Sequence, residues 1–143
     1  MTLAMTKAPD KLSIVVFSGD FGRVHYALAM AAAAASVDRP TTLFFTMESI
    51  RALAPRTSDG SHGWTALPGA AERDAEFAER GVGGFEELFD ACIALNVRIM
   101  VCDMGLRAMG LAPEDLRQDF HYHSGGIVTF LNDASADGAM LFI

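Results

Sequence analysis

LSIVVF, residues 12–17, is an apolar and β-branched run that leads into Ser18, Gly19 and Asp20, which are turn and helix-capping residue types. An Ala-rich helical pattern follows over residues 23–36 and stops before a proline. TTLFFT, residues 41–46, is a second apolar run. Two strands that are apolar on both faces, joined by a helix, predict the start of a parallel sheet covered by helices.

The second half of the chain repeats this alternation. It predicts a helix over residues 85–95, a strand over 97–102, short helices over 105–109 and from 113, a short strand or extended piece over 120–122, a helix over 123–134 and a last strand over 139–143. Strands that alternate with helices predict right-handed crossovers and helices on both sides of one sheet. The fold class is therefore α/β, with three α/β/α layers and a mostly parallel sheet of about five strands, flavodoxin-like in outline.

The length of 143 residues predicts a single domain over residues 1–143, with enough chain to bury a sizeable core. An irregular insert is expected at about residues 54–80. Its first part, 54–69, is rich in Gly, Pro and Ser and predicts a loop, whereas residues 70–80 are charged and favour a helix. Trp64, the only tryptophan, is expected to anchor this loop to a neighbour.

Charge and hydropathy exclude several classes of protein. The formal net charge is −7, and no basic run is present to replace the counterions of a nucleic acid. The most apolar helical stretch, residues 26–37, is shorter than the ~20 residues that cross a bilayer. The first ten residues lack the apolar core of a signal peptide. We therefore expect a cytoplasmic protein with no membrane span, in which two cysteines are more often thiols than a disulfide.

Ligands of open parallel sheets bind beyond the carboxyl ends of the strands, which makes the residues at these ends candidates for a pocket. The residues expected to line such a pocket are Ser18, Gly19, Asp20, Thr46, Asp103, Met104, His121 and His123. Cys102 stands among them, at the end of its strand and directly before a helix. The N–H groups at a helix start favour a thiolate there, while the neighbouring Asp103 disfavours a second negative charge.

The two cysteines have different surroundings in the sequence. Cys92 lies on the apolar stripe of its helix, in register with Leu88 and Phe89, which favours core packing. Cys102 is either a reactive thiol or a small buried core residue, and the residues alone leave both interpretations open. The spacing of the two cysteines is not that of a C-x-x-C redox pair.

Metal and phosphate motifs are weak or absent. His121 and His123 have a spacing that places them on one face of an extended segment, and with Cys102 they could supply three zinc ligands, but we predict no metal. Residues 18–22 match neither phosphate-binding glycine motif, and no G-x-S-x-G elbow is present. We accordingly expect no cofactor.

The C-terminal half carries a resemblance. It includes FEEL at 85–88, LNVRIMVCDMGL at 95–106, MGL at 109–111, PEDL at 113–116, GGIVTFL at 125–131 and AMLFI at 139–143. These segments resemble the DsrE/DsrF-like sulfur-carrier family, in particular its branch labelled peroxiredoxin-like. The resemblance covers most of the chain outside residues 54–80. This chain departs from that branch in having a Ser/Gly/Pro-rich and then acidic insert in place of a basic, Met-rich one, and in having Asp103 after the cysteine.

The resemblance implies a three-layer α/β/α fold, homo-oligomers, and relay of sulfane sulfur through a persulfide on Cys102. The expected partners are sulfur donor and acceptor proteins or small thiols. The first alternative is a non-catalytic module of the same fold that binds a small ligand or a partner. A thiol peroxidase is a weaker alternative, because no peroxidatic T-x-x-C context is present and Cys92 is poorly placed to resolve an oxidised Cys102.

Overall fold

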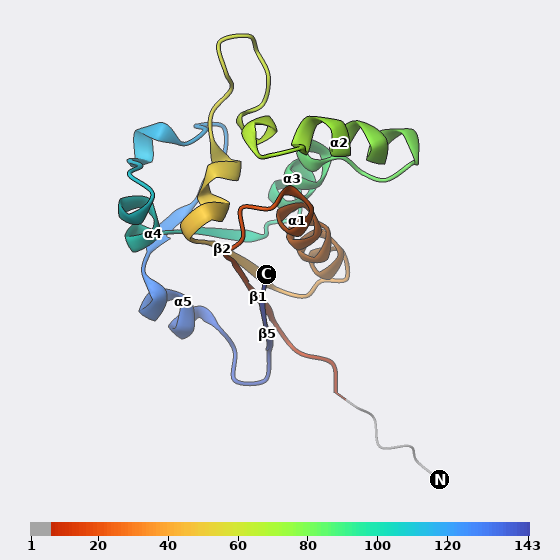
Figure 1. Cartoon of the computed structure of the whole chain (residues 1–143). Coiled ribbons are helices and arrows are strands. Elements are labelled where there is room, and N and C mark those ends of the chain that lie inside the picture. The colour runs from red at the N-terminus through yellow and green to blue at the C-terminus, as the bar shows by residue number, and fades with distance from the viewer. Residues whose placement is uncertain (1–6) are drawn as a thin grey trace.

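Five parallel strands form one sheet at the centre of the molecule (Figure 1). The computed structural model describes residues 7–143. The strands are β1 (Leu12–Val16), β2 (Thr41–Phe45), β3 (Arg98–Cys102), β4 (His123–Gly125) and β5 (Ala139–Phe142), and their order across the sheet is β4-β3-β2-β1-β5. The α/β class and the five-stranded parallel sheet are confirmed. The strand order differs from the 2-1-3-4-5 order of flavodoxin. Here β1 to β4 lie side by side in chain order, and β5 pairs with the other side of β1.

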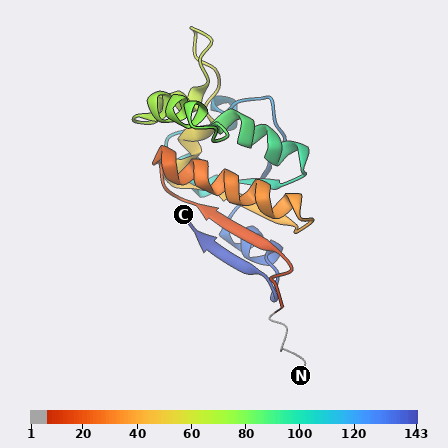
Figure 2. The ribbon, with the colours of Figure 1, turned by 90° about the vertical axis from the view of Figure 1, so that its right-hand side faces the viewer.

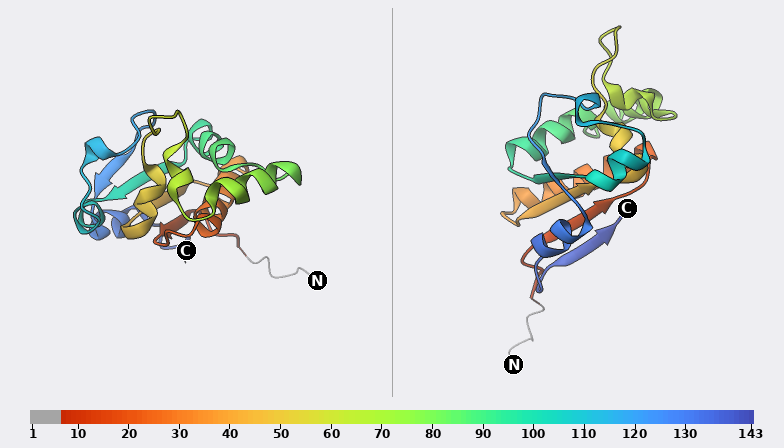
Figure 3. Two further views of the ribbon diagram at one scale, coloured as in Figure 1. Left: turned by 45° about the horizontal axis from the view of Figure 1, so that its top comes forward. Right: turned by 90° about the vertical axis from the view of Figure 1, so that its left-hand side faces the viewer.

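The helices are distributed unequally over the two faces of the sheet. One face is covered by α1 (Phe21–Ser36) and α3 (Phe85–Ala94), with α2 (Ala70–Glu79) above them (Figure 2). The other face carries α5 (Ile127–Asp133), with α4 (Asp103–Ala108) at the carboxyl edge of the strands (right panel of Figure 3). This second layer is thin, and parts of the strand and helix surfaces on that side stay exposed.

The main core lies under α1 and α3. Alternate strand residues point into it, including Ile14 and Val16 of β1 and Ile99 and Val101 of β3, all of them buried. The alanines of α1 allow that helix to lie close to the sheet, and Asp20 caps its first turn by accepting a hydrogen bond from the Arg23 N–H at 3.0 Å.

A smaller core lies on the other face, between the sheet and α5. It contains Phe44, Met100, Cys102 and Phe130, and the rings of Phe44 and Phe130 stack with centroids 4.7 Å apart. Phe130 is the one buried side chain of α5. The stacked pair therefore attaches this helix to β2, beside the strand that ends at Cys102.

The last residue of α5, Asp133, ties that helix to the amino ends of the strands. Its Oδ2 accepts hydrogen bonds from Lys11 Nζ at 2.8 Å and from Thr42 Oγ1 at 2.6 Å, and Arg98 Nε lies 3.4 Å from Oδ1. Burial alone would raise the pKa of Asp133, but hydrogen bonds from Lys11 and Thr42 and the positive charges of Lys11 and Arg98 lower it. The carboxylate stays charged and joins several strands to one helix.

The insert is folded back onto the main core. Its 3₁₀ helix η2 (Gly63–Ala66) carries Trp64, which stacks on Phe85 with centroids 4.7 Å apart and donates its indole N–H to Glu86 at 3.0 Å. The expected anchor is thus formed, within the chain's own core. Arg117 also binds Glu86. Burial alone would raise the pKa of Glu86, but the hydrogen bonds and charge of Arg117 and the indole N–H lower it.

Two local expectations are wrong, and one element was not predicted. The fourth strand is His123–Gly125, not residues 120–122, because Phe120 packs edge-on against Phe89 while the polar segment after it pairs with β3. Residues 123–126 therefore lie before the helix that was expected to begin at residue 123. Residues after β2 form a further 3₁₀ helix, η1 (Met47–Leu53), which no periodicity indicated.

Among residues 7–143, no helix combines the length and the apolar character needed to cross a bilayer.

Replacing Phe130 with alanine tests how α5 is attached to the sheet. We expect Phe130→Ala to lower the free energy of unfolding by about 3 kcal/mol, since a buried ring leaves a cavity against Phe44. Asn132→Ala, an exposed position on the same helix, should change it by less than about 0.5 kcal/mol. Urea denaturation followed by circular dichroism measures both, and equal small effects would contradict this account of the second core.

Candidate functional site

Cys102 occupies the junction between β3 and α4. It is the N-cap residue of α4, with extended backbone angles (φ −73°, ψ 122°), and its Sγ accepts a hydrogen bond from the Gly105 N–H at 3.4 Å. An N-cap side chain normally supplies an oxygen to this N–H group, and here sulfur takes that role. The arrangement gives a negatively charged sulfur a hydrogen-bond donor and the first turn of a helix.

Gly105 fixes the place of this turn. A Cβ on Gly105 would lie 2.8 Å from the Met47 backbone nitrogen, 2.9 Å from Ile50 Cδ1 and 3.0 Å from Thr46 Oγ1, distances too short for any larger residue without movement. The end of β3 is thereby held against the residues that follow β2. Met47 itself adopts a left-handed backbone (φ 51°), which bulky residues rarely do.

The sulfur of Cys102 points into the smaller core. The residue is buried, and it belongs to the cluster with Phe44, Met100 and Phe130. Its partner on the neighbouring strand is Gly125 of β4. Asp103 and Met104, the next two residues, are exposed. The sulfur is therefore shielded from solvent, and a reactant can reach it only after a local movement.

The other strand ends lie at the same edge of the sheet as Cys102. Ser18 Oγ accepts the Asp20 N–H at 3.0 Å, which shapes the turn after β1. Thr46 is buried after β2, and its N–H donates to Ser49 Oγ at 3.2 Å. A Cβ on Gly19 would lie 3.0 Å from the Glu48 Cβ, so these two turns approach closely.

The two histidines lie elsewhere. His123 begins β4 opposite Met100, two residues before the position opposite Cys102, and it lines a separate cavity with His121, Asn96 and Arg98. The imidazole rings meet edge-on with centroids 4.9 Å apart. Burial, Arg98 and His121 together lower the pKa of His123. The structure thus separates the histidine pair from the pocket-lining residues of β1 and β2.

No cluster of three or more His, Cys, Asp or Glu side chains suited to a metal ion occurs within residues 7–143.

Cys92 has the surroundings of a core residue. It is buried in α3, its thiol donates to the Leu28 carbonyl at 3.4 Å, and burial raises its pKa to about 12. Both cysteines are free thiols. They lie in different cores on opposite faces of the sheet, so Cys92 is not in place to exchange with Cys102.

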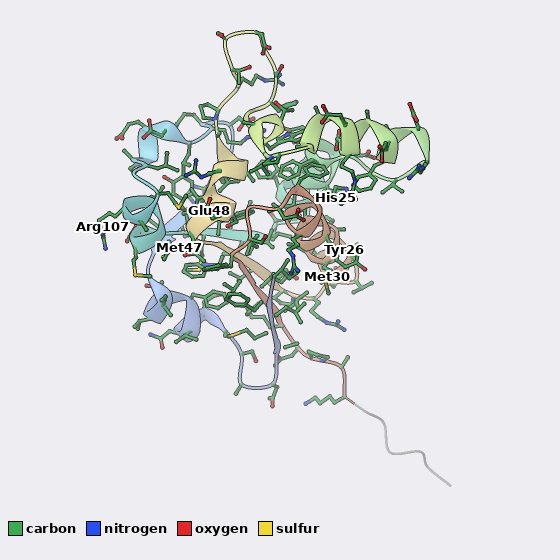
Figure 4. The ribbon with its side chains drawn as sticks, viewed as in Figure 1. His25, Tyr26, Met30, Met47, Glu48 and Arg107 are labelled. Atoms are coloured by element: carbon green, nitrogen blue, oxygen red, sulfur yellow. The ribbon has the colours of Figure 1, made fainter. Side chains whose placement is uncertain are left out.

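A cavity of about 700 Å³ opens at the same edge of the sheet, beside the turn after β1. It is lined by Gly19, Asp20, Glu48, Ile50, Arg51, Ala54, Ala66, Leu67, Pro68, Leu111, Asp115 and Leu116. Figure 4 shows Met47 and Glu48 on η1, between α4 with its outward-pointing Arg107 and α1 with His25. Gly19 and Asp20 were expected to line a pocket. The remaining lining residues come from η1, the insert and the segment after α4, where no sequence motif singled them out.

Comparison with known proteins identifies the family of this chain. The model of the DsrE/DsrF-like family matches residues 10–136, which is most of the chain. The chain belongs to the DsrE/DsrF-like family.

Relatives of this DsrE/DsrF-like chain span nearly its whole length. YrkE of Bacillus subtilis (strain 168), described as uncharacterised, is 25% identical over 162 residues that cover 97% of this chain and 100% of YrkE. The crystal structure of the ychN protein from E. coli matches with a TM-score of 0.59 and 16% identity, over 94% of this chain and 99% of that one. MTH1491 from Methanobacterium thermoautotrophicum, a protein of unknown function, matches with a TM-score of 0.54 and 15% identity, over 93% and 98%. At these identities the two structures show a shared fold.

Substitution of Gly105 tests the contact that positions Cys102 in this DsrE/DsrF-like chain. Gly105→Ala should lower the free energy of unfolding by about 2 kcal/mol, because its Cβ meets backbone and buried side chains of η1. Gly126→Ala is the matched control, since a Cβ there has no atom within 4 Å. Thermal and urea unfolding compare the two variants, and a Gly105→Ala protein as stable as Gly126→Ala would show that the contact is not tight.

Proposed function

We propose that this protein relays sulfane sulfur through a persulfide on Cys102. The observation that carries the proposal is the position of its sulfur, at the end of the inner strand β3 and in hydrogen-bond contact with the first turn of α4. Membership of the DsrE/DsrF-like family supports a sulfur-relay role. The expected partners are a sulfur donor and an acceptor, each a protein thiol or a small thiol. Thiol exchange of this kind needs no cofactor.

The relay consists of two exchanges. In the first, the Cys102 thiolate attacks the outer sulfur of a donor persulfide, a bond forms between the two sulfurs, and the donor's S–S bond breaks. The donor thiolate leaves and takes up a proton, while Cys102 becomes the persulfide. In the second, an acceptor thiolate attacks the outer sulfur and Cys102 is released as a thiolate. The sulfur atom moves between thiols, so no external oxidant or reductant is consumed.

The Gly105 N–H supports both exchanges because it can donate to Sγ whenever that sulfur carries negative charge. Asp103 opposes that charge by proximity. Its carboxylate is exposed, however, and solvent and salt weaken its effect on a buried neighbour.

A second function, ligand or partner binding without sulfur chemistry, is favoured by one observation. Cys102 is buried, and it does not line the large cavity at the same edge of the sheet. In that case Cys102 would serve only as a packed helix cap. A thiol peroxidase has less support, because the buried Cys92 lies on the opposite face of the sheet and its raised pKa disfavours the thiolate needed to resolve an oxidised Cys102.

Mass spectrometry of the intact protein separates these functions. After incubation with inorganic polysulfide and removal of excess donor, we expect an added mass of about 32 Da, one sulfur atom, on the wild-type protein. Cys92→Ser should retain the adduct and Cys102→Ser should lose it, since only Cys102 has the stabilised sulfur.

The same samples identify the alternatives. An unmodified protein whose Cys102 also resists iodoacetamide in the native state would contradict the relay and support the packed helix cap. A sulfenic acid formed by peroxide at Cys102, with no persulfide from polysulfide, would support the peroxidase instead.

We also propose that the protein works as a homo-oligomer in the cytoplasm, where its two free thiols would stay reduced. Exposed apolar side chains gather on the thin layer and on the edge strand β5. Val128 and Phe142 are each 70% exposed, and Ile127, Leu131 and Met140 are also exposed. We call these five residues the α5–β5 patch. A second copy of this chain could cover it, because contiguous apolar surface favours association.

Sedimentation velocity tests the α5–β5 patch. The wild-type protein should sediment as a multiple of its 15.3 kDa chain, and Val128→Glu should shift it to smaller species, because a buried unpaired charge is costly at an interface. Tyr26→Glu is the control: Tyr26 is 63% exposed on α1, on the opposite face of the sheet, and its change should leave the assembly intact. A monomeric wild-type protein, or equal effects of the two changes, would contradict the proposal.

A further inference from the structure

The cavity beside the turn after β1 has the size of a small-molecule site. Its volume of about 700 Å³ lies within the range of roughly 300–1,000 Å³ that such sites span. Four segments that are distant in sequence form its walls: the turn after β1, η1, the end of η2 with the residues after it, and the segment from Leu111 to Leu116. Cys102 is not among the lining residues, so this inference is independent of sulfur relay.

The interior of this cavity is mainly apolar. Ile50 of η1 is fully buried beneath it, and Leu67 and Leu116 are also buried. Leu111 and Ala66 complete the apolar lining from the facing segments. A ligand that fits such walls has an apolar body, because burial of apolar surface is the main favourable contribution available there.

The charged groups at the cavity are predominantly negative. Asp20, Glu48 and Asp115 line it together with a single cation, Arg51. Arg51 Nε already donates to Glu48 Oε2 at 3.1 Å. Asp20 and Asp115 each use one oxygen to accept a backbone N–H, from Arg23 at 3.0 Å and from Ala112 at 2.8 Å. Two carboxylates therefore have no opposite charge beside them within residues 7–143.

The walls are held in place before any ligand arrives. The Leu67 N–H donates to the Trp64 carbonyl at 3.0 Å, and Trp64 is anchored by Phe85 and Glu86. On the facing side, the backbone N–H of Arg117 donates to the Leu53 carbonyl at 2.8 Å. A preformed site binds with a smaller entropic cost than one that must order on binding.

We propose that this cavity binds a small molecule with an apolar body and one positively charged amine. The apolar walls take the body, and the carboxylates of Asp20 and Asp115 complement the ammonium group. The same charges repel an anion of equal shape, so the site discriminates by the charge of the ligand.

Three probes of similar shape test this discrimination: 2-phenylethylamine, 2-phenylethanol and 3-phenylpropionate. We expect the amine to bind about tenfold more tightly than the alcohol, as a charge-assisted hydrogen bond allows, and the carboxylate to bind most weakly. Added NaCl should weaken the binding of the amine and leave the binding of the alcohol unchanged. Isothermal titration calorimetry gives the dissociation constants, and Trp64 fluorescence gives an independent signal because this residue lies in η2, whose last residue lines the cavity.

Two variants locate the bound amine. Asp115→Asn should weaken the binding of 2-phenylethylamine several-fold and leave the binding of 2-phenylethanol unchanged. Asp137→Asn, at an exposed position outside the cavity, should change the affinity for neither probe. Ala66→Phe should weaken the binding of both probes, because the larger side chain at this exposed position of the wall fills part of the cavity without disturbing the core. Unfolding curves confirm that each variant is folded.

Several outcomes would overturn the proposal. These are an alcohol or carboxylate that binds as tightly as the amine, an Ala66→Phe protein with unchanged affinity, and the absence of calorimetric binding for every probe.

Discussion

The close approach between α4 and η1 is the constraint on which the rest of the site depends. Because position 105 has no side chain, the start of α4 lies against the backbone of Met47, and the ends of β2 and β3 meet at one place. The same contact directs the Gly105 N–H toward the sulfur of Cys102. A larger residue would separate the two turns, and the thiol would lose both its donor and its place at the edge of the sheet.

The two faces of the sheet differ in how much apolar surface they bury. The face under α1 and α3 holds the main core, to which the insert is anchored through Trp64 and Glu86. The face under α5 holds only a small cluster around Phe130 and leaves much apolar surface exposed. Stability resides mainly in the first face. The second carries the sulfur of Cys102 and the exposed α5–β5 patch.

The sequence predicted the elements whose apolar pattern is strong, and it failed where tertiary contacts decide the structure. β1, α1 and β2 were expected within two residues of their observed bounds, because burial on both faces leaves few alternatives. β4 was misplaced because His123–Gly125 is polar and is a strand only through its pairing with β3. Cys102 was expected to end a strand, and it is the last residue of β3. The cavity residues Arg51, Leu67 and Asp115 were missed, since only folding brings them together.

The attachment of α5 is unequal at its two ends. Asp133, at the carboxyl end, is fastened to Lys11 and Thr42 by short hydrogen bonds, whereas the amino end follows Gly125 and Gly126 and has no side-chain cap. Between these ends the ring of Phe130 stacks on Phe44, so the helix is attached at its middle and at its carboxyl end. The uncapped end adjoins Gly125, the partner of Cys102 in the sheet. The sulfur therefore lies near the end of α5 that has no side-chain cap, whereas the half-buried carboxylate of Asp133 fastens the far end of that helix.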